Sequence, residues 1–233
     1  MMGKLTRWLW DWAKTIVVAL VIWFTFSTFV LQAFRITSSS MESTLLIGDV
    51  LYVNKMLYGA EVPVVHRRLP AIREPRLGDI VVFESVETPG LTVVKRLVGV
   101  PGDTLAMTDG VLSRNGTAVT EPWVAADRRL MPTDAAGRTQ IRRWTLPLLI
   151  GPPQPDYDPD PNHWGPIVVP AAAYFMMGDN RRDSYDSRFW GFLPARNIRG
   201  RASVIYFSYD ADTYKPLPFL TNIRWRRLLS VPR

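Results

Sequence analysis

The apolar positions of this chain are concentrated first in one long run near the N-terminus. Residues 15–34 read TIVVALVIWFTFSTFVLQAF and carry no charge, and they lie between Lys14 and Arg35. A helix rises about 1.5 Å per residue, so this run is long enough to cover the ~30 Å hydrocarbon core of a bilayer. The pattern therefore predicts one N-terminal transmembrane helix over residues 15–34.

The residues that precede the run are basic and predict its orientation. Lys4, Arg7 and Lys14 place the segment 1–14 on the cytoplasmic side and the rest of the chain outside, as the positive-inside rule requires. A cleaved secretory signal ending at Ala33 is the alternative. The apolar run is longer than the 7–15 residues of such signals, which favours a retained anchor.

From residue 48 onward the pattern changes to short apolar or alternating runs separated by glycine and proline. Strands are predicted at residues 49–53, 80–83, 92–100, 174–177 and 201–209, and a hairpin over 111–120 around Asn115-Gly116. Short strands with this punctuation favour a mainly β, barrel-like antiparallel domain and not βαβ units.

The domain organisation follows from where this β pattern is interrupted. We predict that residues 35–120 and 171–215 form the β-rich domain. Residues 121–170 are predicted to be a loop-rich insertion, because prolines crowd the end of this segment and its periodicity is poor. Residues 216–233 form a basic amphipathic tail, which either lies in a lipid interface or packs on the domain through Trp225.

Composition narrows the possible chemistry. Apolar residues make up 47% of the 233, enough for a sizeable core, and the chain has no cysteine, which excludes disulfides, thiolate metal sites and a cysteine nucleophile. The two histidines, His66 and His163, stand in proline- and arginine-rich segments. They make a multi-histidine metal site and a Ser-His-Asp triad poor candidates, so we predict no metal and no cofactor.

The net charge of +7 points to an anionic partner. The basic residues lie near the N-terminus, in the middle and near the C-terminus, and they do not form one stripe. No nucleic-acid motif accompanies them. We therefore predict that the partner is the lipid bilayer, and that the chain does not bind nucleic acid.

Three consecutive serines, Ser38 to Ser40, follow the apolar run. On composition alone they indicate a flexible polar loop. A serine nucleophile needs a base, and Lys95 is a candidate because apolar residues surround it in a predicted strand. Burial there would lower its pKa from about 10.4 towards the roughly 7–8 that a base needs. Without a partner motif, a lysine pointing to water at a strand edge is the more common arrangement.

Four blocks of sequence supply that partner motif. They are Ser40-Met41-x-x-Thr44-Leu45, Gly78-Asp79-Ile80-Val81-Val82-Phe83, Lys95-Arg96-Leu97-Val98-Gly99-Val100-Pro101-Gly102-Asp103 and Gly178-Asp179-Asn180-Arg181-x-x-Ser184-x-Asp186-Ser187-Arg188-x-Trp190-Gly191. In this order, behind an apolar run, they closely resemble the bacterial type I signal peptidases, which are membrane-bound serine proteases with a Ser-Lys dyad. The resemblance covers residues 34 to about 202 and the segment 223–225.

The resemblance implies a role for each matching residue of the dyad. Ser40 matches the nucleophile, and Lys95 matches the general base. Ser38 matches the hydroxyl that forms the oxyanion hole together with the backbone N–H of Ser40. Ser184 matches the hydroxyl that hydrogen-bonds the lysine amine.

Asp186 and Arg188 match an ion pair that supports the catalytic loop. Two positions depart from the family pattern: Ser43 stands where proline is usual, and Arg182-Asp183 stands where Asp-Asn is usual. The turn after the nucleophile is therefore expected to be less rigid, and the ion pairing of the loop is expected to differ in detail.

The implied activity is that of signal peptidase I, an endopeptidase that removes N-terminal signal peptides from exported preproteins through an acyl-enzyme. It cuts after small residues of the Ala-x-Ala type, on the extracytoplasmic (periplasmic) side of the bacterial inner membrane. The substrate is expected to add as an extended strand. Ile36, Leu45, Tyr52 and Val93 are predicted to line its pockets.

Two other functions remain open from the sequence. One is a catalytically inactive, membrane-tethered homologue that binds exported peptides or scaffolds an envelope complex. The other is a soluble Ser-Lys self-cleaving regulator on a related β fold. The apolar run and the lack of a DNA-binding helical region count against the second.

Overall fold

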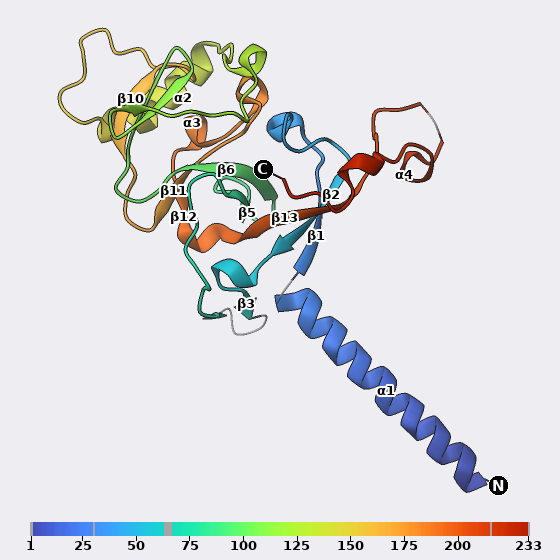
Figure 1. Cartoon of the computed structure of the whole chain (residues 1–233). Coiled ribbons are helices and arrows are strands. Elements are labelled where there is room, and N and C mark those ends of the chain that lie inside the picture. Colours follow the sequence, from blue (N-terminus) through green and yellow to red (C-terminus); the bar gives the residue numbers. More distant parts are fainter. Residues whose placement is uncertain (1, 30, 63–66, 215, 233) are drawn as a thin grey trace.

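An antiparallel sheet of seven strands forms the centre of the molecule (Figure 1). The structure is a computed structural model, and it describes residues 2–29, 31–62, 67–214 and 216–232. The strands, in spatial order, are β1 (Leu31–Arg35), β2 (Asp49–Asn54), β13 (Ile198–Ser208), β5 (Ile80–Glu84), β6 (Thr92–Gly99), β11 (Ala173–Met177) and β12 (Leu193–Pro194). The order runs from β1 to β12 without closing, so the sheet is a half-barrel and not a full barrel.

The burial pattern and the pairing register of the strands show which side chains face the core and which residues lie opposite one another. In β2 the side chains alternate between buried and half-buried, the period-2 pattern of a strand with one face in the core. Strand β5 has four consecutive buried residues, Ile80–Phe83, as expected for a strand covered on both faces. It pairs with β6 so that Val81 lies opposite Lys95. The mainly β, antiparallel fold predicted from the sequence is confirmed.

A second sheet of four strands packs beside the first. Its order is β10 (Trp164–Val168), β7 (Thr104–Thr108), β8 (Val111–Arg114) and β9 (Thr117–Ala118). Asn115 and Gly116 join β8 to β9 with φ of 55° and 79°. Positive φ at both positions is the signature of a type I′ turn, so the predicted hairpin is confirmed. A small ribbon of β3 (Glu61–Val62) and β4 (Arg67–Arg68) completes the strands.

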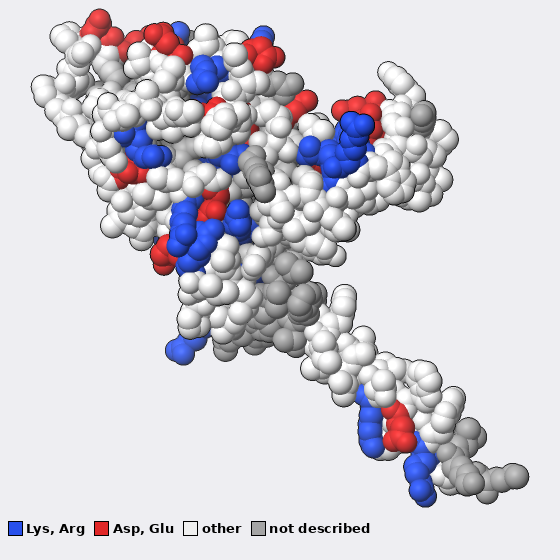
Figure 2. Space-filling view, in the orientation of Figure 1, with Lys and Arg blue, Asp and Glu red and all other residues white. Residues whose placement is uncertain are grey.

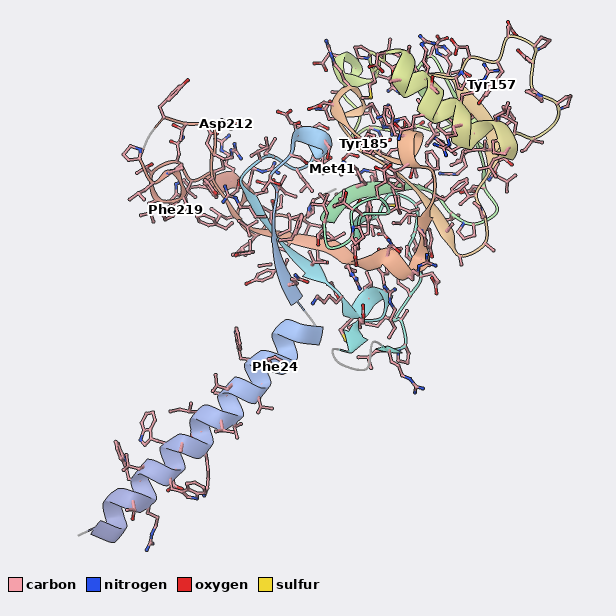
Figure 3. All side chains as sticks on the ribbon, turned by 180° about the vertical axis from the view of Figure 1, so that it is seen from behind. Phe24, Met41, Tyr157, Tyr185, Asp212 and Phe219 are labelled. Atoms are coloured by element: carbon pink, nitrogen blue, oxygen red, sulfur yellow. The ribbon has the colours of Figure 1, made fainter. Side chains whose placement is uncertain are left out.

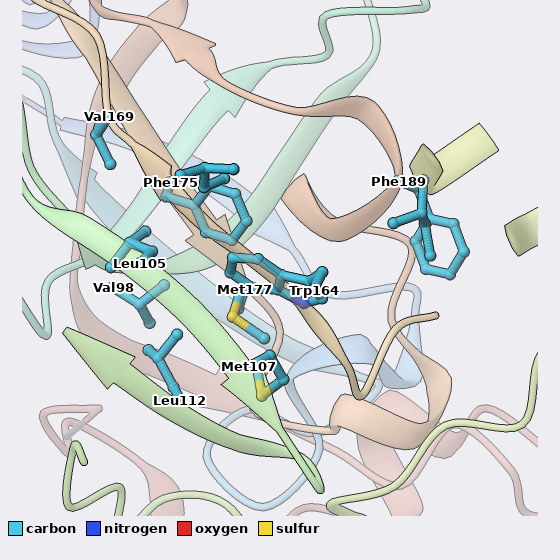
Figure 4. Close-up of a cluster of buried hydrophobic side chains, with 11 residues drawn as sticks. Val98, Leu105, Met107, Leu112, Trp164, Val169, Phe175, Met177 and Phe189 are labelled. Carbon is cyan, nitrogen blue, oxygen red and sulfur yellow. The ribbon is translucent and has the colours of Figure 1, made fainter. Parts of the chain in front are cut away.

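The two sheets share an apolar cluster around Phe175 (Figure 4). Phe175 of β11 lies against Trp164 of β10, with ring centroids 5.1 Å apart, and Leu105 of β7 is fully buried beside them. Aromatic pairs at this distance contribute beyond their buried area. The cluster fixes the second sheet against β11, the strand that leads into residues 178–188.

The N-terminal helix α1 runs from Met2 to Phe29, so it begins before the predicted span of 15–34 and ends before the last residues of that span. After the helix the chain forms β1, whose Leu31–Arg35 pair with Asn54–Val50 of β2. These backbone bonds come from a partner distant in sequence, which an apolar run cannot reveal. Among the residues that the structure describes, no helix is both long enough and apolar enough to cross a membrane.

The side chains of α1 project away from the rest of the molecule (Figure 3). Trp23 is 67% exposed and Phe24 is 60% exposed. Figure 2 shows charged side chains on α1 only towards its N-terminal end, with uncharged side chains over the rest of its described surface. The helix therefore presents an unusually apolar surface.

The segment 121–170 contains more regular structure than the loops and few strands that were predicted. It holds the 3₁₀ helices η3 (Ala126–Arg128) and η4 (Leu146–Leu148), the helix α2 (Ala135–Thr145) and strand β10. Asp134 caps α2 by accepting from the N–H of Gly137 at 2.8 Å. Of α2, Ile141 and Thr145 are buried, which is too few residues to give a helical period in the sequence. Because β10 pairs with β7, the second sheet takes strands from both sides of residue 120.

The C-terminal segment contains α4 (Pro218–Thr221) and the 3₁₀ turn η7 (Trp225–Arg227). Arg227 donates to the buried carboxylate of Asp49, and Arg224 donates to the carbonyl of Ile47 at 2.8 Å. Trp225 is 73% exposed. Of the two alternatives predicted for this tail, packing through Trp225 is not observed, because Arg224 and Arg227 make its contacts with the domain.

Candidate active site

Ser40 lies in a short 3₁₀ turn, η1 (Ser39–Met41), that follows β1. Met41 fixes the turn because its side chain is fully buried in a cluster with Ile36 and Leu45. The N–H of Leu45 also donates to the carbonyl of Met41 at 2.8 Å. The position of Met41 is labelled in Figure 3. The hydroxyl of Ser40 is thus presented from a rigid turn.

Lys95 projects from β6 and meets this turn. Its amine donates to the hydroxyl oxygen of Ser40 over 2.5 Å, although the two residues are 55 positions apart. Lys95 is only 3% exposed. The structure therefore brings together the two residues that the sequence singled out as nucleophile and base.

Burial is the main reason that the Lys95 amine is poised to lose its proton. Desolvation lowers its pKa from 10.5 to about 8. Asp186 opposes this shift by raising the pKa, Arg188 lowers it, and Asp179 and Asp183 raise it. At a pKa of about 8, roughly half of the amines are neutral at pH 8 and can act as a base.

Ser38 and Ser39 take different positions around the nucleophile. The hydroxyl oxygen of Ser38 lies 3.3 Å from that of Ser40. The hydroxyl of Ser39 instead donates to the carboxylate of Asp183, and its carbonyl accepts from the side-chain amide of Asn180 at 3.2 Å. Ser38 is therefore next to the reacting oxygen, whereas Ser39 ties the turn to the catalytic loop, which we define as residues 178–188.

The catalytic loop begins at a glycine that touches both halves of the site. A Cβ at Gly178 would lie 2.4 Å from the carbonyl oxygen of Ser40 and 2.2 Å from the hydroxyl oxygen of Ser184, so only glycine fits. Ser184 is 2% exposed. Its hydroxyl makes no hydrogen bond to the Lys95 amine, so the predicted bond is not formed in this structure.

Asp186 and Arg188 form a buried ion pair that closes the catalytic loop. The Arg188 guanidinium donates to both carboxylate oxygens, at 2.8 and 3.0 Å, and neither residue is more than 1% exposed. Asp186 also accepts from the N–H of Gly178 at 3.0 Å and caps the short helix α3 (Ser187–Trp190). Burial alone would raise the pKa of Asp186, but Arg188 and the Gly178 N–H outweigh it and hold that pKa below its usual range.

A second buried ion pair adjoins Lys95, and the sequence reasoning missed it. Arg96 donates to both oxygens of Asp179 at 2.7 Å, and its guanidinium lies 4.3 Å from the ring centroid of Trp123. Thr44 donates to the same carboxylate at 2.5 Å. Arg96, Asp179 and Thr44 each belong to one of the four sequence blocks. The blocks therefore contained these residues, but the sequence did not show that they bond to one another.

The four residues predicted to line substrate pockets do not all come together. Ile36 and Leu45 are buried in the cluster with Met41, and Val93 is half-buried two residues before Lys95. Tyr52 instead stacks on Tyr206, with ring centroids 4.3 Å apart.

A cavity of about 370 Å³ is lined by residues of β1, β2, β5, β6 and β13. Phe34 of β1, Val82 of β5 and Thr92 of β6 contribute to this lining. Neither Ser40 nor Lys95 lines the cavity, and Thr92 stands three residues before Lys95 in β6.

The one histidine that the structure describes, His163, lies outside this arrangement. His66 lies outside the described residues. His163 contacts the carboxylates of Asp109 and Asp160, whose hydrogen bonds raise its pKa. Over the described ranges, the chain has no group of three or more histidine, cysteine, aspartate or glutamate side chains that could hold a metal ion.

A serine hydroxyl hydrogen-bonded to a buried lysine amine is the arrangement of a serine hydrolase whose base is lysine. The family model for signal peptidase, peptidase S26, matches residues 9–207. The chain belongs to this family of serine endopeptidases.

Curated relatives agree with this assignment. Signal peptidase I of Pseudomonas fluorescens is 32% identical over 224 residues, which cover 91% of this chain and 78% of that protein. Signal peptidase I of Leptolyngbya laminosa is 33% identical, over 83% of this chain and 77% of that protein. A crystal structure of a signal peptidase I from Enterococcus faecalis is 27% identical and covers 57% of this chain and 100% of that one, with a TM-score of 0.40.

Proposed function

We propose that Ser40 and Lys95 carry the signal peptidase I activity of this chain, which removes signal peptides from exported preproteins. The observation that supports these roles is the 2.5 Å hydrogen bond between the buried lysine amine and the serine hydroxyl. The lowered pKa of that amine, about 8, suits a base that works near neutral pH.

The proposed reaction proceeds through an acyl-enzyme. The neutral amine of Lys95 takes the proton of Ser40 as the hydroxyl oxygen attacks the carbonyl carbon of the scissile bond. The protonated amine then gives this proton to the leaving amine of the mature protein as the C–N bond breaks. In the second half, Lys95 takes a proton from a water molecule as the water oxygen attacks the carbonyl carbon of the ester. The C–O bond to Ser40 then breaks, Lys95 returns the proton to the Ser40 oxygen, and the signal peptide leaves with a new carboxylate.

Ser38 is proposed to stabilise the negative charge that develops on the substrate carbonyl oxygen. Its hydroxyl lies 3.3 Å from the Ser40 hydroxyl oxygen, next to the position where this charge forms. It would donate together with the backbone N–H of Ser40. A single donor of this kind is worth about 10²–10³ in rate.

The catalytic loop is proposed to hold the lysine in place. Ser184, buried beside Gly178, is available to accept from or donate to the Lys95 amine once the side chains adjust to substrate. The buried Asp186–Arg188 ion pair keeps the loop in position. A catalytic dyad needs such support, because the surrounding residues must hold its two side chains in the reactive geometry.

The substrate is proposed to bind as an extended strand between β1 and β6, so that backbone bonds give affinity. Small residues of the Ala-x-Ala type would fit against Ile36, Leu45 and Val93. We leave Tyr52 out of this pocket because it stacks on Tyr206.

We also propose that α1 holds the enzyme at the bacterial cytoplasmic membrane, with the N-terminus cytoplasmic and the β-rich part extracytoplasmic. The support is the exposed apolar surface of α1 and the basic residues Lys4, Arg7 and Lys14 near its start. Alkaline extraction of membranes and protease protection in spheroplasts test attachment and sidedness. Recovery of the protein in the soluble fraction would refute the attachment.

The dyad is tested by a cleavage assay on a synthetic signal-peptide substrate. Ser40→Ala and Lys95→Ala should each abolish cleavage while leaving the circular dichroism spectrum unchanged. Substantial cleavage by either variant would refute the assigned roles. No specific observation favours the inactive homologue or the self-cleaving regulator.

A further inference from the structure

The segment Glu121–Val124, which follows β9, lies against the catalytic loop. Glu121 is 5% exposed and Arg181 is 1% exposed. Arg181 donates through both terminal nitrogens to the two carboxylate oxygens of Glu121, one of these bonds being 3.0 Å long. The remaining guanidinium N–H donates to the carbonyl of Gly178 at 2.9 Å. Such a bidentate arginine–carboxylate ion pair is strong and directional.

Trp123 extends the same contact to the two other parts of the site. Its backbone carbonyl accepts from the hydroxyl of Ser43 at 2.7 Å. Its ring lies under the guanidinium of Arg96, the neighbour of Lys95 in β6, at 4.3 Å. A cation over an indole ring is attracted to its face, so this stacking is favourable.

The Glu121–Val124 segment thus touches all three pieces of chain that build the dyad. These are the turn of Ser40 through Ser43, the strand of Lys95 through Arg96, and the catalytic loop through Arg181. The pieces are far apart in the sequence, and their relative position sets the distance between the serine oxygen and the lysine amine.

We propose that Glu121 and Trp123 are positioning residues for the Ser40–Lys95 dyad, acting through Arg181, Arg96 and Ser43. This inference rests on the proposed function of the dyad, and it assigns a role in catalysis to a segment outside the four sequence blocks that carry the family resemblance.

Electrostatics around Lys95 explain why the Glu121–Arg181 pair matters to catalysis. The charged groups that act on the lysine amine are Asp186, Arg188, Asp179 and Asp183, and all four lie on the catalytic loop that Arg181 anchors. Three of them are carboxylates, which favour the charged amine.

Removing the charge of Glu121 would leave a buried guanidinium unpaired, which strongly destabilises its surroundings. The catalytic loop would then shift relative to Lys95. Weaker contact with the three carboxylates and the uncompensated positive charge of Arg181 both disfavour the protonated amine. The pH midpoint of catalysis should therefore move to lower pH.

Ser43 supports the same inference, because its backbone φ is 102°. Proline, the usual residue of the family at this position, has φ fixed near −65° and cannot adopt that conformation. The turn after the nucleophile was expected to be less rigid without proline. In this chain the bond from the Ser43 hydroxyl to Trp123 supplies the restraint instead.

The test compares variants of the full-length enzyme in detergent, with kcat and KM on a signal-peptide substrate, the pH profile and the thermal midpoint measured for each. Glu121→Gln should lower kcat at least tenfold, leave KM within twofold and move the pH midpoint down. Glu121→Asp, which keeps the charge, should recover part of the loss. Asp103→Asn is the matched control, since it removes a buried carboxylate just before β7 that accepts from the side-chain amide of Asn115. It should lower the thermal midpoint without changing the pH profile.

A Glu121→Gln enzyme with kcat within twofold of wild type and an unchanged pH midpoint would overturn the positioning role while leaving the dyad intact. An active Ser40→Ala enzyme would instead overturn the proposed function itself. If Glu121→Gln does not fold, Ser43→Ala decides. A loss of kcat at an unchanged thermal midpoint supports the proposal, and unchanged kcat and pH profile overturn it.

Discussion

Replacing Lys95 by methionine should abolish cleavage and at the same time stabilise the fold at neutral pH. The pKa of Lys95 falls from 10.5 in the unfolded chain to about 8 in the folded protein. The unfolded state therefore binds more protons between these two values, and the contribution of Lys95 to stability rises with pH across that window. Below pH 8 the folded protein must bury a charged amine, at a cost of about 3 kcal/mol relative to pH values above 10.5.

Methionine has a similar length and carries no charge, so Lys95→Met removes this cost. Part of the gain is offset by the lost hydrogen bond to Ser40, which is worth about 1 kcal/mol. The variant should therefore be more stable than wild type at pH 7 by about 2 kcal/mol, and the difference should shrink as the pH rises towards 10.

Urea unfolding of both proteins at pH 7, 8, 9 and 10 measures this difference, because the other ionisable groups cancel in the comparison. Lys14→Met, an equivalent change at an exposed position of α1, serves as the control and should show no such trend. A Lys95→Met protein that is less stable than wild type at pH 7, or whose stability difference does not change with pH, would show that the buried amine does not carry the lowered pKa.

Three further outcomes follow from the same site. The cleavage rate should rise about tenfold per pH unit up to pH 8 and then level, as a Lys95 base with a pKa of about 8 requires, and a profile that is flat from pH 5 to 9 would contradict it. Ser38→Ala should lower kcat about 10²–10³-fold with little change in KM, and a loss confined to KM would assign Ser38 to substrate binding instead. Asp186→Asn should lower the unfolding free energy by about 3–5 kcal/mol in denaturant titrations, because it leaves the buried charge of Arg188 without a partner. A loss below about 1 kcal/mol would show that this ion pair does not stabilise the fold.

The strands and the tight hairpin could be predicted because their signals are local. Alternation along residues 49–53 and the Asn115-Gly116 turn depend on the backbone preferences of neighbouring residues. Helix α2 could not be predicted in the same way, since its buried Ile141 packs in the cluster around Phe175 and its buried Thr145 accepts from the hydroxyl of Tyr157. The helix–strand boundary after Phe29 was missed for a related reason, because β1 depends on pairing with β2.

For the candidate site, too, the sequence supplied the local information and the fold supplied the contacts between distant residues. The sequence by itself determined which residues are candidates, since Ser40 and Lys95 stand in ordered blocks behind an apolar run and no cysteine competes for the role. It also indicated that a lysine among apolar neighbours would be desolvated.

Only the tertiary structure decided how these residues meet and what holds them. The 2.5 Å contact between Ser40 and Lys95 exists because the turn after β1 is brought against β6 across the half-barrel. The pairings of Arg96 with Asp179 and of Arg181 with Glu121 join segments that are 83 and 60 positions apart. A buried charge is tolerated only beside a partner of opposite charge. The residue type shows that such a partner is needed, but only the fold determines which residue it is.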